Sequence, residues 1–188
     1  MGTGTIILII VGVVVLLLIF YVISVYNKLV NMRNKVRDQW AQIDVQLKRR
    51  VDLIPNLVET VKGYAKHEKE TLDEVIEARN SFNSANTKEA EIDANNQITS
   101  ALTKLFALSE AYPELKANEN FISLQADLKD TEDKISFARQ FYNDVVLNYN
   151  NLIEMFPSNI IAGMFKFNAE NFFKVENEEE RNAPKVSF

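Results

Sequence analysis

Cysteine is absent from the 188 residues, and histidine occurs only once, at His67. The lack of cysteine excludes disulfides, thiolate metal sites and cysteine nucleophiles together. His67 has no second histidine at the spacing of a zinc-binding helix or of the paired Glu-x-x-His motifs in di-metal bundles. A nucleophilic serine would depend on the same lone base, and no Gly-x-Ser-x-Gly motif occurs. We therefore expect an exposed His67, no metal, no other cofactor and no enzymatic activity.

Glycine and proline are also scarce, with five and four residues respectively, which leaves few places for tight turns. This favours helices joined by short connections. Gly63 is isolated within a predicted helix, where a close contact between helices explains it as well as a ligand does. Basic residues are concentrated between residues 28 and 66, but the formal net charge of the chain is -5, so we expect no nucleic-acid partner.

Residues 6–26 carry no charge, and they are long enough to cross the hydrocarbon core of a bilayer as a helix. A cleaved signal peptide is the rival interpretation. The leader, residues 1–5, has no basic residue and no Ala-x-Ala site follows the apolar run, so we expect an uncleaved anchor. Basic side chains follow the span but do not precede it, which predicts an exterior N-terminus and a cytoplasmic C-terminal domain. The same side chains are our candidates for lipid headgroup contacts: Lys28, Arg33, Lys35 and Arg37.

A stripe with alternating spacings of three and four predicts that the first helix continues out of the membrane. Its positions are Tyr26, Leu29, Arg33, Val36, Trp40, Ile43, Leu47, Arg50 and Ile54. We expect the two arginines of the stripe to reach water from its edge. The alternative is a buried ion pair that fixes the register of the helices. Pro55 is predicted to end this helix and to start the next one.

Three further amphipathic helices follow. The second carries its apolar face from Val58 to Phe82 and fades in a polar link over residues 80–87. The third begins near Thr87 and ends at Tyr112-Pro113. The fourth keeps its 3-4 spacing from Phe121 to Phe156, with Asn118 or Asn120 as its cap.

The predicted fold is therefore all-α: an N-terminal transmembrane helix that continues into an antiparallel up-down-up-down four-helix bundle. A short extra C-terminal helix is expected over residues 157–165. The domains are a short exterior N-terminus (1–5), the transmembrane helix (6–26), the bundle (27–165) and a tail (166–188). We expect phenylalanines to dock part of the tail, and residues 176–182 to be mobile.

The C-terminal part of the fourth helix is rich in phenols and amides. Core packing, with polar tips hydrogen-bonded to neighbouring helices, is the default interpretation, and a ligand groove is the alternative. The residues are Tyr142, Asn143, Asn148, Tyr149, Asn150 and Asn151.

A second basic cluster, Lys48, Arg49 and Arg50, lies too far along an upright helix to touch the anchoring membrane. Its partners are either another protein, a second copy, or acidic residues of the fourth helix such as Asp130, Glu132 and Asp133. We take these three basic residues as candidate partner contacts.

Several stretches resemble the LemA family, and together they cover nearly the whole chain. The most specific is the continuous run from Gln42 to Ala65, and others are residues 26–30, 110–118, 131–135, 138–143, 149–150 and 156–159. The resemblance implies a single-pass bacterial protein of the inner membrane with a cytoplasmic helical bundle. It implies no established enzymatic activity, and one branch of the family works at magnetosome membranes.

From these features we expect a membrane-anchored helical scaffold or interaction protein that self-associates, contacts membrane lipids and takes part in membrane organisation. The alternative is an accessory or regulatory subunit of a membrane enzyme or transporter.

Overall fold

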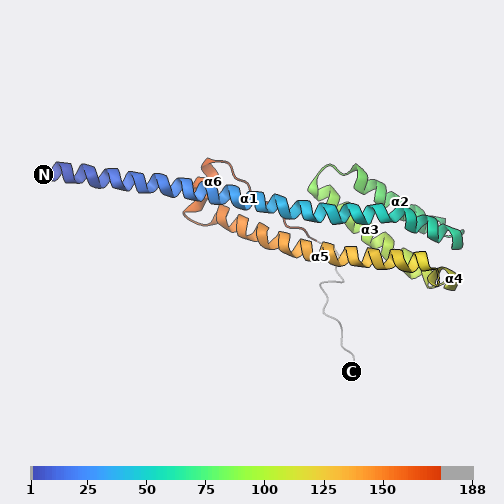
Figure 1. Ribbon diagram of the computed structural model, residues 1–188. Helices are drawn as coiled ribbons and strands as arrows, with labels where there is room; N and C mark the ends of the chain where they lie inside the picture. Colours follow the sequence, from blue (N-terminus) through green and yellow to red (C-terminus); the bar gives the residue numbers. More distant parts are fainter. Residues whose placement is uncertain (1, 175–188) are drawn as a thin grey trace, which may run out of the picture. The chain divides into compact units, whose positions relative to one another are not determined.

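The computed structural model describes residues 2–174, and all the regular secondary structure in this range is helical (Figure 1). The elements are α1 (Thr3–Tyr64), α2 (Lys69–Ser84), α3 (Lys88–Ser109), α4 (Pro113–Lys116), α5 (Glu119–Glu154) and α6 (Ser158–Met164). The all-α prediction is confirmed, including the antiparallel packing of the helices and the short helix after Pro157.

Helix α1 continues from the apolar N-terminal segment without a break, as predicted, but it does not end at Pro55. That prediction was wrong. Proline removes one helical hydrogen bond and crowds the preceding turn, at a cost of about 3 kcal/mol. Ile54, Leu57 and Val58 are all buried around it, and this packing outweighs the local preference of proline. The turn instead comes at residues 65–68, after Gly63, whose missing Cβ would meet only open space. A close helix contact therefore does not explain Gly63.

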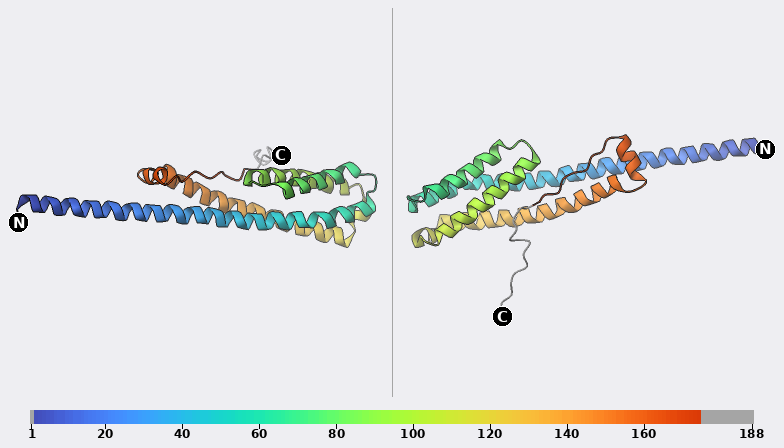
Figure 2. Two further views of the ribbon diagram at one scale, coloured as in Figure 1. Left: turned by 90° about the horizontal axis from the view of Figure 1, so that it is seen from above. Right: turned by 180° about the vertical axis from the view of Figure 1, so that it is seen from behind.

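The chain divides into two compact units. Among the described residues, one of them comprises residues 43–139 together with residues 173–174. Its helices are the second part of α1, the α2–α3 hairpin, the short α4 and the first part of α5, packed antiparallel (Figure 2). Its core is aliphatic and includes Ile54, Leu57, Ile98, Leu105 and Leu115.

Two helix starts in this unit follow the sequence-based prediction. The Thr87 hydroxyl accepts a hydrogen bond from the Ala90 N–H at 3.2 Å. The Asn118 side-chain oxygen accepts one from the Phe121 N–H at 3.0 Å. Each supplies a partner for a backbone donor that the helix itself leaves unpaired.

The other unit comprises residues 1–42 and 140–172: the first part of α1, the last part of α5, α6 and an extended segment after it. Its core includes Leu29, Val36, Tyr142, Val146 and Tyr149. Trp40 meets the Tyr142 ring edge-to-face, with 5.5 Å between ring centroids. These aromatic contacts join α1 to α5 within the unit.

The N-terminal part of α1 is long and apolar enough to cross a membrane, with a mean hydropathy of 3.6 over its most apolar window. None of that window is buried by the other parts of the protein that the structure describes, unlike the central helix of a soluble protein. This indicates a membrane anchor.

Beyond α6, the described part of the tail is extended and carries two buried phenylalanines, Phe167 and Phe173, whereas Phe172 is exposed. The expected mobility of residues 176–182 concerns positions outside the described residues.

Candidate functional site

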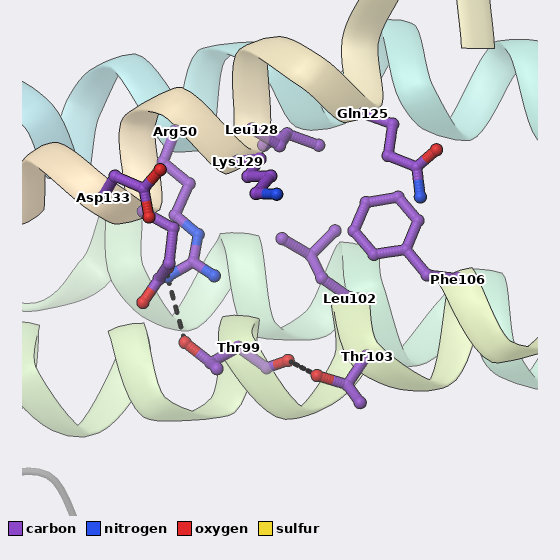
Figure 3. A pocket seen from close by; sticks show the side chains of 10 residues that line it. Arg50, Thr99, Leu102, Thr103, Phe106, Gln125, Leu128, Lys129 and Asp133 are labelled. Carbon is purple, nitrogen blue, oxygen red and sulfur yellow. Dashed lines mark hydrogen bonds and ion pairs between the residues drawn. The ribbon is translucent and has the colours of Figure 1, made fainter. Parts of the chain in front are cut away.

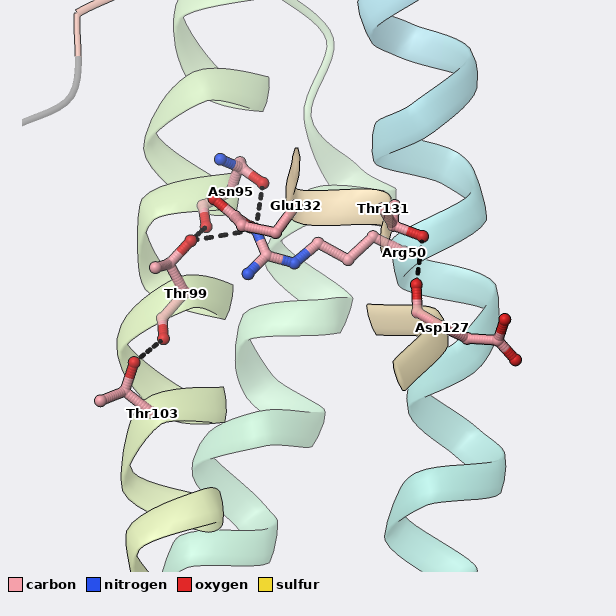
Figure 4. Close-up of polar contacts among 7 residues, drawn as sticks. All are labelled: Arg50, Asn95, Thr99, Thr103, Asp127, Thr131 and Glu132. Carbon is pink, nitrogen blue, oxygen red and sulfur yellow. Dashed lines mark hydrogen bonds and ion pairs between the residues drawn. The ribbon is translucent and has the colours of Figure 1, made fainter. Parts of the chain in front are cut away.

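Arg50 occupies the polar centre of the unit formed by residues 43–139. It is 4% exposed, so the expectation that it reaches water was wrong. Its Nη1 donates hydrogen bonds to Asn95 Oδ1 at 2.9 Å and to Thr99 Oγ1 at 3.0 Å, and it lies 2.8 Å from Glu132 Oε2. Figure 4 shows the side chain extending from α1 toward α3, with Glu132 of α5 beside it. The alternative of a buried ion pair holds in part: the Arg50 guanidinium is buried, whereas the Glu132 side chain is 45% exposed.

Burial lowers the pKa of the Arg50 guanidinium, and the negative charge of Glu132 opposes that effect. Arginine nevertheless stays protonated at physiological pH. The group therefore cannot exchange protons with Glu132 as an acid–base couple. The Arg50 guanidinium connects α1 to α3 and α5. A buried charge of this kind makes other relative alignments of the three helices unfavourable, because they would leave it without partners.

The two preceding basic residues lie nearer to the surface. Arg49 is paired with α5, with Nη1 3.3 Å from Asp130 and Nη2 3.7 Å from Asp127. Lys48 Nζ lies 2.7 Å from Asp44 on its own helix. The interpretation that this basic cluster meets acidic residues of the fourth helix is confirmed for Arg49 and Arg50. A partner contact stays a prediction for Lys48 and Arg49, and the burial of Arg50 removes its side chain from such a surface.

A hollow of about 480 Å³ adjoins this polar centre (Figure 3). Leu102 and Phe106 of α3 and Leu128 of α5 supply apolar walls. Arg50 and Asp133 lie toward one end of it in Figure 3. The remaining lining residues are polar or charged, so the hollow has a mixed character.

The phenol- and amide-rich part of α5 contributes to a packed core through Tyr142, Tyr149 and Asn150, as the default interpretation held. Asn148 and Asn151, in contrast, are exposed. Tyr142 and Tyr149 are buried. The Tyr142 hydroxyl donates to the Asn171 carbonyl at 3.0 Å, and the Asn150 side chain exchanges two hydrogen bonds of 2.9 Å with the Glu170 backbone. These partners belong to the extended segment after α6, rather than to neighbouring helices as expected.

The four predicted headgroup contacts all lie on α1 within the unit of residues 1–42 and 140–172. Lys28, Lys35 and Arg37 are exposed. Arg33 is half-buried, with its guanidinium carbon 5.1 Å from the centroid of the Phe167 ring. Burial raises the pKa of Tyr149, and the positive charges of Arg33 and Arg37 oppose the shift. Lipid contact by these four residues stays a prediction.

His67 is exposed, as expected. Within residues 2–174, no group of three or more His, Asp or Glu side chains is arranged to hold a metal ion.

The sequence did not identify Asn95 and Thr99 as partners of a charged side chain. Asn95 follows Ala94 on the inner face of α3, and a buried amide there signals a polar partner on a facing helix. Arg50 is one of two arginines in the otherwise mainly apolar stripe of α1. The sequence did not indicate that these two irregularities match each other.

Residues 39–188 match the LemA family. Protein LemA of Metamycoplasma hominis is 26% identical over 147 residues, which cover 77% of this chain and 67% of that protein. Magnetosome protein MamQ 2 of Paramagnetospirillum magneticum is 23% identical over 175 residues, covering 79% of this chain and 64% of MamQ 2. MamQ of Magnetospirillum gryphiswaldense is likewise 23% identical, over 64% of its length. The chain thus spans about two thirds of the length of these relatives. Because the family match covers most of its residues, the chain belongs to the LemA family.

Proposed function

We propose that this protein is a membrane-anchored helical scaffold that associates with further copies of itself and organises membrane. The continuity of α1 carries this proposal, because one uninterrupted helix runs from the exposed apolar segment into both compact units. A continuous helix connects the membrane segment to the helical residues that follow it more stiffly than a flexible linker would. The similarity to MamQ, a magnetosome protein by name, supports a role in membrane organisation.

An exposed aromatic pair on α5 supports self-association. Phe137 and Phe141 are 64% and 62% exposed. They stand four residues apart, so they lie one above the other on the same face of the helix. Large exposed aromatic side chains are typical anchors of protein interfaces, and the same pair on a second copy offers a matching surface.

Light scattering on the detergent-solubilised full chain tests self-association. We expect a mass above that of one chain, and a fall in that mass on Phe137→Ser with Phe141→Ser. Ile122→Ser, at another exposed apolar position of α5, is the matched control and should leave the mass unchanged. A preparation that stays monomeric across concentration, with no crosslinked copies in cells, would contradict the proposal.

The proposed location is the bacterial cell membrane, with the N-terminus outside and the helical units in the cytoplasm. The exposed basic residues after the apolar segment, Lys28, Lys35 and Arg37, support both this orientation and contact with anionic headgroups. No catalytic step belongs to the proposal, and reproducible substrate turnover by the purified chain would contradict that part of it.

The alternative function, an accessory subunit of a membrane enzyme or transporter, draws on the exposed head groups of Lys48 and Arg49. Reversing both charges to Glu should abolish a specific copurification without unfolding the domain. Lys62→Glu, another exposed lysine of α1, is the control. Retention of the same partner by the double variant would exclude this docking surface.

A further inference from the structure

The segment around α6 exposes a group of large apolar side chains. No charged residue occurs between Glu154 and Lys166. Phe156, Ile160 and Met164 are 79%, 55% and 69% exposed. Met155 and Phe165 are exposed as well, so the apolar surface extends beyond the helix itself.

The opposite side of α6 is fixed to the protein. Ser158, Ile161 and Ala162 are buried, and the Phe167 N–H donates to the Ala162 carbonyl at 2.9 Å. Ile160 and Met164 are one helical turn apart, so they share the outward face. The segment is thus an anchored element with one apolar side that the described residues leave exposed, and not a frayed end of the chain.

The position of this surface identifies what covers it. Phe165 and Phe167 contact Tyr26, with ring centroids 4.8 and 5.8 Å apart. The first charged residue of the chain is Lys28, and Tyr26 lies two positions before it, so Tyr26 marks the level at which α1 leaves the hydrocarbon. The contact brings α6 beside that level within the same compact unit, and Figure 1 shows α6 lying alongside α1.

An element with one apolar and one protein-bound side, held at the level of the membrane surface, is suited to the interfacial zone of the bilayer. Interfacial helices commonly carry phenylalanine on their apolar side, and Phe156 and Phe165 flank α6. Lys166 follows at once, with a backbone φ of 54° that turns the chain away from the helix.

We propose that α6 and its flanking residues insert into the interface of the bilayer that α1 crosses, as a second membrane contact of the chain. The occupant of the apolar surface is lipid. This inference rests on the membrane anchoring in the proposed function and adds a site to it. Two points of attachment restrict the tilt of the first part of α1 relative to the bilayer more than a single span does.

The absence of cysteine allows a direct test. Single cysteines at Ile160 and Met164 are spin-labelled in the full chain, which is reconstituted into vesicles of phosphatidylcholine with phosphatidylglycerol as the minor component. Collision rates with oxygen, which concentrates in lipid, are compared with those of a water-soluble nickel complex. Ile122→Cys provides an exposed apolar control on α5, and Leu17→Cys provides a reference within the apolar segment. Circular dichroism confirms that each variant is folded.

We expect the ratio of oxygen to nickel collisions at residues 160 and 164 to exceed the ratio at residue 122 several-fold and to approach that at residue 17. Equal ratios at 160, 164 and 122, with residue 17 in lipid, would overturn this inference and leave the anchor intact. A residue 17 label in water would overturn the anchor and this inference together. Shielding of residues 160 and 164 from both probes, with spin–spin broadening, would assign the surface to a second copy and overturn lipid contact.

Discussion

Arg50 illustrates how one charged side chain becomes part of a helical core. Taking a guanidinium out of water is unfavourable by several kcal/mol unless its donors find partners. Here Asn95 and Thr99 of α3 accept hydrogen bonds from Nη1, and the Glu132 carboxylate of α5 supplies the opposite charge. Removing Arg50 therefore leaves a cavity and a buried amide without its partner, both of which destabilise the folded state.

Arg50→Ala is expected to lower the free energy of unfolding by roughly 3 kcal/mol, because it opens a cavity and leaves the buried Asn95 amide without its partner, whereas Glu132 is half-exposed and stays solvated. Arg49→Ala, one position earlier, removes only the partly exposed pair with Asp127 and Asp130 and should change stability by less than about 1 kcal/mol. Thermal unfolding of the full chain in detergent, followed by circular dichroism, measures both. Equal effects of the two variants would show that Arg50 is not the structural centre described above.

Glu91 gives a pH-dependent prediction. Partial burial, reinforced by the nearby charge of Asp44, raises the pKa of its carboxyl above the ordinary value of 4.5, and Oε2 is buried without a hydrogen-bond partner. The folded state thus disfavours the ionised form. Ionisation of Glu91 therefore destabilises the folded state relative to the unfolded state. This destabilisation is absent below the unfolded pKa of the carboxyl, and it is fully present once the pH has risen through the folded pKa.

Glu91→Gln should therefore raise the Tm at pH 7, and the difference from the parent chain should shrink as the pH falls below the ordinary glutamate pKa. Glu77→Gln, at an exposed position of α2, is the control and should change Tm little at either pH. A larger gain for Glu91→Gln in acid than at neutral pH would contradict the assignment.

At the scale of the elements, α1 shows tertiary packing overriding a local signal. Proline disfavours a helix interior, yet α1 passes through Pro55 and ends at Tyr64. Pro55 itself is exposed, whereas Ile54, Leu57 and Val58 beside it are buried. The helix persists because breaking it there would withdraw these side chains from the core.

Pro55→Ala distinguishes a helix that is continuous through residue 55 from a helix that ends there and is followed by a new one. Within a continuous helix, alanine restores a backbone hydrogen bond and removes a clash, so the variant should be more stable by roughly 2 kcal/mol after the loss of proline's rigidity in the unfolded chain. At the first position of a new helix, where proline is favoured, the variant would gain nothing. Urea unfolding of the full chain in detergent measures the change, with Asn56→Ala as the neighbouring exposed control.

At the scale of the whole molecule, the two long helices α1 and α5 each contribute to both compact units. One unit adds the α2–α3 hairpin, and the other adds α6 with the extended segment that bonds to Tyr142 and Asn150. Each unit therefore has a core of its own, built on shared helices.

Orientation across the membrane is a prediction at this scale, and the cysteine-free sequence again makes it testable. In intact cells, a membrane-impermeant maleimide should label Thr5→Cys and should leave His67→Cys unlabelled until the membrane is opened, because the basic residues after the span resist translocation. Labelling of His67→Cys in intact cells would invert the proposed topology.

The sequence alone determined the helical class, the apolar anchor, the helix start near Thr87 and a cap at Asn118 or Asn120. It also determined most of the inward-facing positions of the helices, but not Phe156, which the spacing of the fourth helix placed inward and which is 79% exposed. All of these depend on spacing or on contacts within a few residues. The inward face from Val58 to Val61 was assigned correctly even though the helix containing it was divided at the wrong residue, since periodicity is insensitive to where a helix ends.

The tertiary structure decided the features that depend on residues far apart in the chain. The burial of Arg50 required Asn95 and Glu132 to face it, which the stripe of α1 does not record. The passage of α1 through Pro55 depended on how much core its neighbours fill. The uncovered apolar side of α6 became apparent only when the contact with Tyr26 set it beside the end of the membrane segment. Local patterns specify which face of a helix turns inward, whereas only packing specifies what that face meets.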